Sequence, residues 1–321
     1  MKKIFSIFLA AMLFLLTGCE AETAEGNGVL YQFEDALGYT VTVRTAEHVA
    51  AIGGSNAETW FLAGGTLTAL TEDAYSERGI EPSEEVINLG TVKSPDVETM
   101  ILSGVDFVNK KKKIAEHVAL RSTLENAGMT TVYFSIETFE DYLTMLKICT
   151  EITNRPDCYE KNGISIQKQI DDVISRTAGK DAPSVLFIRA YSTGAKAKNS
   201  NTMTGAMLKD LGCRNIADSD DSLLENLSME AIIREDPDFI FVTTQGASTE
   251  AAEKTLAESL QSNPAWGELS AVKNGRYIVL PRNLFHYKPN NRWGESYEML
   301  AEILYLHGHT IDDMYQYSVP D

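Results

Sequence analysis

Residues 98–108 read ETMILSGVDFV, and residues 230–240 read EAIIREDPDFI. In both segments a glutamate opens a short amphipathic helix, and eight residues later an aspartate introduces an apolar strand that begins with phenylalanine. A second, looser pair lies at 124–129 and 208–213, where a glycine ends each predicted helix. Two similar helix–strand units in one chain predict two similar lobes.

Apolar runs and helical patterns alternate along the rest of the chain. Strands separated by helices of this length form parallel sheets with right-handed crossovers. We therefore predict an α/β protein with two Rossmann-like lobes, each built around a parallel sheet. The strands are expected at 40–44, 106–109, 130–134, 184–189, 239–243 and 276–280. The helices are expected at 56–63, 95–103, 114–127, 137–153, 202–211, 228–235, 248–261 and 295–306.

The segment 157–180 lacks strand signals and is predicted to join the lobes, 29–156 on one side and 181–321 on the other. Its later part spaces Ile170, Val173 and Ile174 as on one face of a helix. A helix of roughly 20 residues spans about 30 Å. One stiff connection of this kind would let the lobes flex only modestly around a ligand cleft between them.

The start of the chain predicts a cellular address. Two lysines precede the apolar run 4–16, which is too short to span a bilayer and is typical of a secretory signal. The run ends in Leu-Thr-Gly-Cys, similar to a bacterial lipobox, so we expect removal of residues 1–18 and lipidation of Cys19. A plain signal peptide with an incidental cysteine is the alternative. Residues 19–28 are small and acidic and are predicted to tether an extracytoplasmic protein to the cell membrane.

The charge balance excludes one class of partner. The chain has 28 Lys and Arg against 46 Asp and Glu, a formal net charge of -18, which would repel the phosphates of nucleic acids. An anionic ligand would have to meet a local basic patch. The composition, 44% hydrophobic and 23% charged, is typical of a folded chain.

Basic residues gather in loops that follow predicted strands, where ligands bind in parallel sheets. In the run Lys110–Lys113 we expect the last three lysines to be solvated. Elsewhere cations alternate with aromatic rings, a combination that suits a flat or bulky anionic ligand. The candidate ligand-binding residues are Trp60, Arg189, Tyr191, Lys198, Arg282, His286, Tyr287, Lys288, Arg292 and Trp293. For Trp60 a place in the core remains equally open.

Metal and thiol chemistry have weak signals. His286 and Tyr287 could ligate haem iron directly, although such a pair more often serves hydrogen bonding or packing, and no other metal site is expected. His307 and His309 are expected at the surface. Cys149, Cys158 and Cys213 lack CxxC spacing, which argues against a zinc site. A disulfide between Cys149 and Cys158 is left open.

Catalytic signatures are missing from the sequence. It has no Gly-x-Ser-x-Gly elbow, no His-Glu-x-x-His and no phosphate-binding glycine loop. An extracytoplasmic hydrolase stays an alternative only because catalytic triads are spatial. Ser55 and Glu58 have the spacing of a helix capping box, so a structural role is expected for them.

The chain resembles the solute-binding proteins of bacterial ABC importers that capture ferric siderophores, haem and cobalamin. The resemblance covers nearly all of the chain after residue 18. In one departure, Val105 stands where this family usually has proline before the aspartate of the first unit, whereas Pro237 is kept in the second. The most specific stretches are 55–58, 98–108, 230–242 and WGELSAVKNGRY at 266–277.

The resemblance implies a monomeric binding protein rather than an enzyme, with two lobes, one linking helix and no intrinsic cofactor. Its ligand would be an iron complex, a ferric siderophore first and haem second, with cobalamin as the alternative. A membrane permease and its ATPase would be the partners. By position, Glu98 and Glu230 match the glutamates that dock on permease arginines in this family. A carboxylate in a first helical turn also stabilises the helix dipole by about 0.3–1 kcal/mol, and the two roles are compatible.

Overall fold

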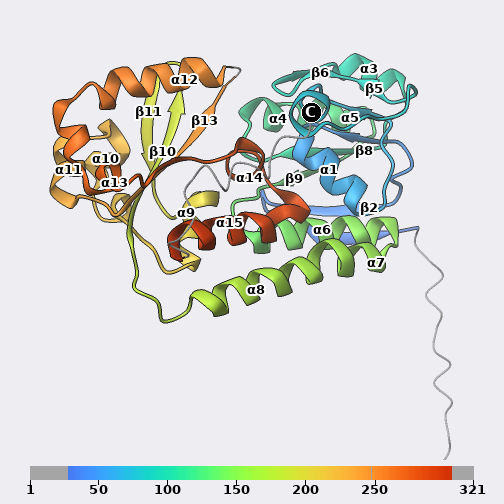
Figure 1. Cartoon of the computed structure of the whole chain (residues 1–321). Coiled ribbons are helices and arrows are strands. Elements are labelled where there is room, and N and C mark those ends of the chain that lie inside the picture. Colours follow the sequence, from blue (N-terminus) through green and yellow to red (C-terminus); the bar gives the residue numbers. More distant parts are fainter. Residues whose placement is uncertain (1–27, 247, 306–321) are drawn as a thin grey trace, which may run out of the picture.

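The first lobe contains a five-stranded parallel sheet. The computed structural model describes residues 28–305 apart from 247 (Figure 1). The strand order is β5-β4-β3-β8-β9, so the order reverses between β3 and β8, which is where open α/β sheets bind ligands. The strands are β3 (Val49–Ala51), β4 (Ala69–Leu70), β5 (Ile87–Asn88), β8 (Phe107–Lys111) and β9 (Thr130–Phe134).

The second lobe contains a mixed sheet, which corrects the expectation of purely parallel sheets at one edge. The order is β11-β10-β13-β14, with β12 also paired to β10. β11 forms an antiparallel hairpin with β10, whereas β12, β13 and β14 run parallel to their partners. The strands are β10 (Ser184–Tyr191), β11 (Gly194–Lys198), β12 (Arg214–Asn215), β13 (Phe239–Gln245) and β14 (Tyr277–Val279).

Helices follow most of these strands. In the first lobe they are α1 (Gly54–Leu62), α2 (Asp73–Arg78), α3 (Val97–Leu102), α4 (Ala115–Ala119), α5 (Arg121–Asn126) and α6 (Phe139–Thr153). In the second they are α9 (Met203–Asp210), α10 (Asp221–Asn226), α11 (Met229–Glu235), α12 (Thr249–Leu256), α13 (Ser270–Lys273), α14 (Arg282–Phe285) and α15 (Trp293–Tyr305).

Short elements complete the chain. The strand predicted at 40–44 is β2 (Thr40–Val43), but it pairs antiparallel with β1 (Tyr31–Glu34) outside the parallel sheet. β6 (Gly90–Thr91) and β7 (Ser94–Pro95) form another small hairpin. Single turns of 3-10 or π helix lie at η2 (Ile216–Asp218), η3 (Ala257–Gln261), η4 (Pro264–Glu268) and η5 (Asn290–Arg292).

The repeated helix–strand unit has the same internal construction in both lobes. Asp106, just before β8, accepts the backbone N–H groups of Glu47 at 3.1 Å and His48 at 3.2 Å, just before β3. Asp238, just before β13, accepts the backbone N–H and the hydroxyl of Ser184, both at 2.8 Å, where β10 begins. Each aspartate therefore accepts hydrogen bonds that hold the start of the neighbouring parallel strand in place. This shared role explains why an aspartate precedes the strand in both units.

The looser repeat is also structural. Gly128 and Gly212 have φ values of +89° and +88°, a conformation that favours glycine at a helix end. The residue after each glycine donates its N–H to a leucine carbonyl, Met129 to Leu124 at 3.1 Å and Cys213 to Leu208 at 2.9 Å.

A helical segment joins the lobes along the lower edge of Figure 1. It comprises α7 (Pro156–Tyr159), a π-helical turn η1 (Glu160–Ile164) and α8 (Ser165–Thr177). The π turn contains Gly163, where a Cβ would come within 3.0 Å of Leu143. α15 packs closely along α8, because a Cβ on Gly294 would lie 2.4 Å from Gln169 Oε1.

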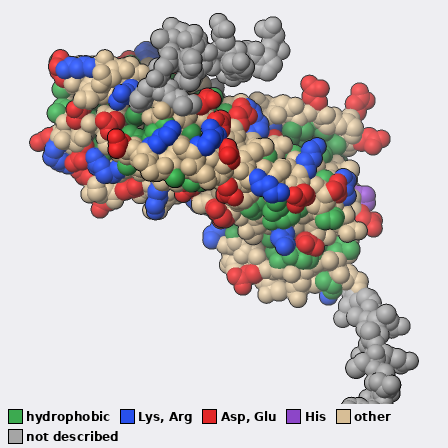
Figure 2. All heavy atoms as spheres, turned by 60° about the horizontal axis from the view of Figure 1, so that its bottom comes forward, with side chains coloured by type: hydrophobic (Ala, Val, Ile, Leu, Met, Phe, Trp, Pro, Cys, Tyr) green, Lys and Arg blue, Asp and Glu red, His purple; other side chains and the backbone are tan. Residues whose placement is uncertain are grey.

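The lobes share more than this connection. One continuous hydrophobic core includes residues of the first sheet, such as Val132, residues of the second, such as Phe187 and Phe241, and Trp293 of α15. The linking helix alone therefore does not determine the lobe arrangement, because α15 returns the chain to both lobes. Figure 2 shows the face that carries α8, where basic and acidic side chains are interspersed rather than gathered into a single patch.

Several sequence expectations are corrected or lie elsewhere. α1 begins after Gly53 with no side-chain cap, so the capping box at Ser55 and Glu58 is wrong. A complete capping box occurs instead at Thr138 and Asp141, at the start of α6. Cys149, Cys158 and Cys213 are free thiols. The signal segment 1–18, Cys19, the tether up to residue 27, and His307 and His309 lie outside the described residues. Within the described part of the chain, each helix is too short or too polar to cross a membrane.

Candidate ligand-binding site

The first lobe presents Lys111 at its topological switch point. Lys111 ends β8, and Gly53 follows the neighbouring β3 with φ +119°. A Cβ on Gly53 would lie 2.3 Å from Lys111 Cε, so glycine leaves room for the lysine to cross the turn. The Lys111 backbone N–H donates to His117 Nδ1 at 3.0 Å, and its Nζ lies 3.9 Å from Asp73 Oδ2. Only 29% of the Lys111 side chain is exposed, so the expectation that it is solvated is wrong.

The other lysines of the run differ in environment. Lys110 is fully buried on the opposite face, where its Nζ donates to the Tyr133 hydroxyl at 2.8 Å. Burial lowers the pKa of Lys110 to about 7. Lys112 donates to the Ala36 carbonyl at 2.6 Å, and Lys113 is 62% exposed and pairs with Glu137 at 2.9 Å.

The second lobe presents two arginines at the carboxyl ends of its strands. Arg189 lies near the end of β10, on the same face as Tyr191 two residues later. Arg282 begins α14 and donates to the Tyr287 hydroxyl at 2.7 Å and to Thr249 Oγ1 at 3.3 Å. The Nε atoms of both arginines are buried without a hydrogen-bond partner. Buried N–H groups of this kind are normally paired, so these two Nε atoms are unsatisfied donors.

His286 lies among these cations. Burial, with further contributions from Arg189, Arg282 and Lys288, lowers its pKa to about 4. The imidazole is therefore neutral at neutral pH, and its Nδ1 is also buried without a partner. Its ring centre lies 5.0 Å from that of Tyr287.

Side chains from the two lobes meet at this site. The guanidinium of Arg78, on α2, lies 5.8 Å from the ring centre of Tyr287. Lys288 Nζ lies 3.3 Å from Glu137 Oε1. Asn290 is fully buried and donates to Glu58 Oε2 at 2.7 Å and to the Ser55 carbonyl at 3.1 Å.

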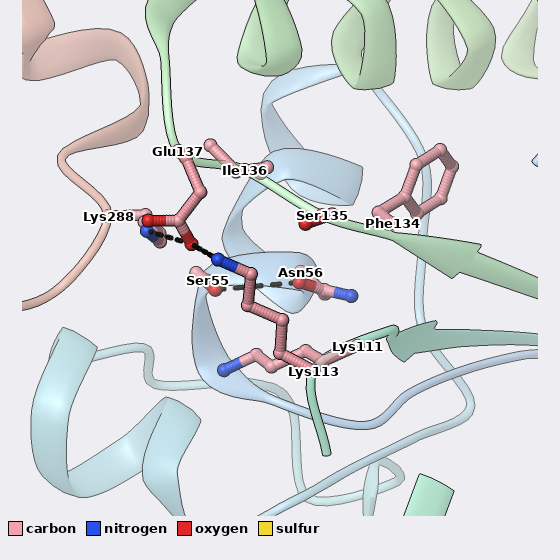
Figure 3. A pocket seen from close by; sticks show the side chains of 9 residues that line it. All are labelled: Ser55, Asn56, Lys111, Lys113, Phe134, Ser135, Ile136, Glu137 and Lys288. Carbon is pink, nitrogen blue, oxygen red and sulfur yellow. Dashed lines mark hydrogen bonds and ion pairs between the residues drawn. The ribbon is translucent and has the colours of Figure 1, made fainter. Parts of the chain in front are cut away.

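A cavity of about 100 Å³ lies at this meeting point (Figure 3). Ligand pockets usually hold about 300–1,000 Å³, so a bulky ligand would require the lobes to part. Lysines from both lobes and Glu137 point toward one another around the cavity. It is lined by Ser55, Asn56, Lys111, Lys113, Phe134, Ser135, Ile136, Glu137 and Lys288.

Both predicted tryptophans are core residues, which corrects their place among the ligand-binding candidates. Trp60 is 2% exposed, donates to the Thr66 carbonyl at 2.8 Å and packs on Phe107. Trp293 is fully buried and packs edge-on against Phe139. A sequence in which rings alternate with cations does not show whether a ring lies in the cleft or in the core. Here α1 and α15 both direct their tryptophan into the core.

Two predicted cations also lie away from the cavity. Lys198 pairs with Phe187 across the β10–β11 hairpin, whereas Tyr191 pairs with Gly194, so Lys198 lies about 13 Å along the strand from the rim. Arg292 forms a two-pronged ion pair with Glu295, with both N–O distances 2.7 Å. Both were expected to contact ligand. Arg189, Arg282, His286 and Tyr287 do not line the cavity either, but they lie next to Lys288, which does.

Three residues of the site were missed by sequence reasoning. Arg78 follows β4, whose two residues form no recognisable apolar run. Glu137 follows the correctly placed β9, and the rule that ligands bind after strands could have identified it. Lys111 was assigned to solvent because lysine runs usually are solvated.

Glu98 and Glu230 are both exposed, in the first turns of α3 and α11. These helices lie far apart in Figure 1, one on each lobe. Exposed aliphatic side chains accompany the glutamates, Ile101 and Leu102 on α3 and Ile233 on α11.

Metal ligation by clustered side chains has no support in the described part of the chain. No group of three or more His, Cys, Asp or Glu residues there is arranged to hold a metal ion. The site combines cations, neutral donors and aromatic rings with the carboxylates of Glu58 and Glu137.

Comparisons with known proteins agree with this architecture. The chain is 22% identical to the Fe(3+)-citrate-binding protein YfmC of Bacillus subtilis over 294 residues, which are 87% of this chain and 89% of the relative. The haem complex of IsdE from S. aureus matches with a TM-score of 0.67 and 16% identity, over 81% of this chain and 100% of that one. The petrobactin-binding protein YclQ of B. subtilis matches with a TM-score of 0.66 and 18% identity, over 85% and 96%.

The two structural likenesses establish the fold, a two-lobed α/β architecture. A family model described as periplasmic binding protein matches residues 49–284, which include both sheets and most of the site. On this match, the chain belongs to the periplasmic binding protein family.

Proposed function

We propose that this protein is the substrate-binding component of an ABC importer and captures an anionic iron complex between its lobes. The observation that carries the proposal is the pair of buried, unpartnered Nε donors on Arg189 and Arg282, beside the neutral His286. Charged donors beside aromatic rings bind anionic chelates by hydrogen bonds, charge complementarity and burial of ring area. This function needs binding and release, with no catalytic step.

A ferric siderophore is the first candidate ligand and haem the second. YfmC is named for ferric citrate and YclQ for petrobactin, whereas IsdE was solved with haem. The cationic rim favours the anionic ferric chelates over cobalamin. Haem is the second candidate because the imidazole of His286 and the phenol of Tyr287, two groups that can ligate haem iron, lie side by side.

The cellular part of the proposal rests on the sequence before residue 28. A lipobox-like Leu-Thr-Gly-Cys would leave Cys19 as the lipidated first residue of an extracytoplasmic, membrane-anchored monomer, with residues 20–28 as its tether. The division into 29–156, 157–180 and 181–321 belongs to the same proposal.

Docking on the permease is assigned to Glu98 and Glu230. Both carboxylates are exposed, one on each lobe, and each has an exposed aliphatic neighbour on its helix. Two separated charges fix the orientation and the rate of association more than the affinity, which suits a partner that must be released. Reversing both charges would abolish ABC-dependent uptake while leaving ligand binding intact.

The ligand can be identified directly. The protein is purified from its native host, and its visible spectrum is recorded together with its native mass. A broad charge-transfer band with the mass of a ferric chelate is expected, and a Soret band would identify haem. A corrin spectrum would replace the proposed ligand with cobalamin. Turnover of a bound compound would contradict the function itself.

A further inference from the structure

Glu137 connects the two lobes through a single carboxylate oxygen. Its Oε1 lies 2.9 Å from Lys113 Nζ in the first lobe and 3.3 Å from Lys288 Nζ in the second. Figure 3 shows all three side chains converging on the cavity, with Glu137 between the two ammonium groups. The side chains of Glu137 and Lys288 are only 27% and 23% exposed, so this contact is partly shielded from water.

The position of Glu137 is fixed by its backbone rather than by its side chain. Its N–H donates to Asp141 Oδ2 at 2.8 Å, and Asp141 belongs to the capping box that starts α6. The carboxylate itself contacts two lysines from different parts of the chain. Lys113 is 62% exposed, and Lys288 lies in the loop after α14. The side chain can therefore rotate away without disturbing the helix.

The cavity holds more positive than negative charge. Lys111, Lys113 and Lys288 line it together with one carboxylate, that of Glu137. Its volume of about 100 Å³ is too small for a siderophore, so the lobes must part before such a ligand enters. Parting the lobes separates Lys288 from Glu137, whereas the pair between Lys113 and Glu137 lies within one lobe and survives.

We propose that Glu137 is an internal substitute for the ligand's anionic group and thereby selects the ligand by charge. In the ligand-free protein its carboxylate bridges Lys113 and Lys288 and holds the lobes together. A chelate that carries carboxylates or comparable oxyanions displaces it and takes over both lysines. A neutral or cationic chelate cannot compensate the lysines and leaves the bridge in place. This inference rests on the proposed function and specifies its ligand class.

The test uses ferric citrate as the probe and three variants of the full chain. Glu137→Gln removes the charge, whereas Glu137→Asp keeps the charge but shortens the reach to the two lysines. Glu140→Gln is the matched control, because Glu140, three residues later in the first turn of α6, is an exposed carboxylate that does not line the cavity. Calorimetry measures affinity, and small-angle X-ray scattering measures the radius of gyration of each ligand-free protein.

The bridge predicts that both substitutions of Glu137 strengthen binding. Removing a competing carboxylate should tighten ferric citrate binding about tenfold for Glu137→Gln, whereas the exposed control should change it less than about twofold. Glu137→Asp should show an intermediate gain, which a purely long-range charge effect would not give. Ligand-free Glu137→Gln should have a larger radius of gyration than the wild type.

The outcomes separate this inference from the proposed function. Wild-type binding of ferric citrate without any gain in the two Glu137 variants would overturn the inference and leave the function in place. If no variant binds ferric citrate, the result counts against the function for this ligand, and scattering alone decides on the bridge. A larger radius of gyration for ligand-free Glu137→Gln would then support the bridge through Glu137, and an unchanged radius of gyration would overturn it.

Discussion

The two lobes are built on the same helix–strand unit, but their rims carry charge differently. In the first lobe each rim cation has a carboxylate of its own lobe, as Arg78 has Glu58 at 3.0 Å and Lys111 has Asp73 at 3.9 Å. In the second lobe, neither Arg189 nor Arg282 has a carboxylate within 4 Å among the described residues. We therefore expect Arg189 and Arg282 of the second lobe to meet most of a ligand's negative charge, because the two first-lobe cations already have carboxylate partners.

The largest expected effect is on binding, from the second lobe. Arg189→Gln should weaken binding of ferric citrate about 10- to 100-fold, because a hydrogen bond to a charged group is worth about 1.5–3 kcal/mol. Calorimetry measures the change. Arg214→Gln is the control, since Arg214 is an exposed arginine of the same lobe paired with Glu235. If Arg189→Gln and Arg214→Gln bound ferric citrate with equal affinity, the second-lobe arginine would not contribute more to binding than an exposed one.

In the first lobe the same kind of replacement should affect stability instead. Arg78→Gln leaves the partly buried Glu58 without its cation, and burial already raises the pKa of that carboxyl. We expect the free energy of unfolding to fall by about 2 kcal/mol, measured by urea denaturation. Adding Glu58→Gln should recover part of the loss, because the unpaired charge is then gone. If the double variant had a lower free energy of unfolding than Arg78→Gln alone, the loss in Arg78→Gln would not come from the unpaired Glu58 carboxylate.

The repeated aspartates test whether the two units are equivalent. Asp106→Ala and Asp238→Ala each remove an acceptor for at least one backbone N–H at the start of a neighbouring strand. Each should lower the unfolding free energy by about 1–2 kcal/mol. The corresponding asparagine variants, which retain an oxygen acceptor, should lose less. A loss confined to one lobe would show that the sequence repeat does not correspond to a shared structural role.

The smallest effects concern histidine and pH. Burial lowers the pKa of His117 and takes that of His286 to about 4, so both are neutral in the folded protein. The unfolded histidines bind protons first, near pH 6.5, so the contribution of the two histidines to stability should be constant above that pH. It should fall as the pH drops toward 4.

Substitution distinguishes the two histidines. His117 uses both ring nitrogens, with Lys111 N and the Val92 carbonyl, whereas Nδ1 of His286 has no partner. His117→Asn should therefore cost more stability at pH 7 than His286→Asn. Either substitution should reduce the slope between pH 6.5 and 4, and NMR titration should place the His286 midpoint near 4. A His286 midpoint near 6.5 would contradict its buried, cation-rich surroundings.

Local sequence patterns predicted what local interactions determine. The strand at 130–134 was placed to the residue, and both helix–strand units were found because cap, helix, aspartate and strand are contiguous. The strands β4 and β5 were missed because two residues leave no periodic signal. β11 was missed because an antiparallel hairpin does not follow the strand–helix alternation.

The site was less predictable because its partners are distant in sequence. Their place after strands predicted Arg189, Arg282, His286, Tyr287 and Lys288, and the structure brings these side chains near one another. Their contact with a ligand stays a prediction. The pairing of Lys288 with Glu137 spans 151 residues, and no local pattern encodes it. Trp293 was wrongly placed in the cleft, and Trp60 was left open between cleft and core, because the alternation of rings with cations does not show which face of a helix a ring occupies.

We have proposed that a cationic rim between the lobes captures an anionic iron chelate. Calorimetric titration of the purified protein with ferric citrate, and with the cationic chelate ferrioxamine B, tests it most directly. We expect saturable binding of ferric citrate, and this binding should weaken as salt screens the charges. It should be lost in the double variant Arg189→Gln/Arg282→Gln. Citrate binding that is unaffected by this double variant, or saturable binding of ferrioxamine B alone, would contradict it.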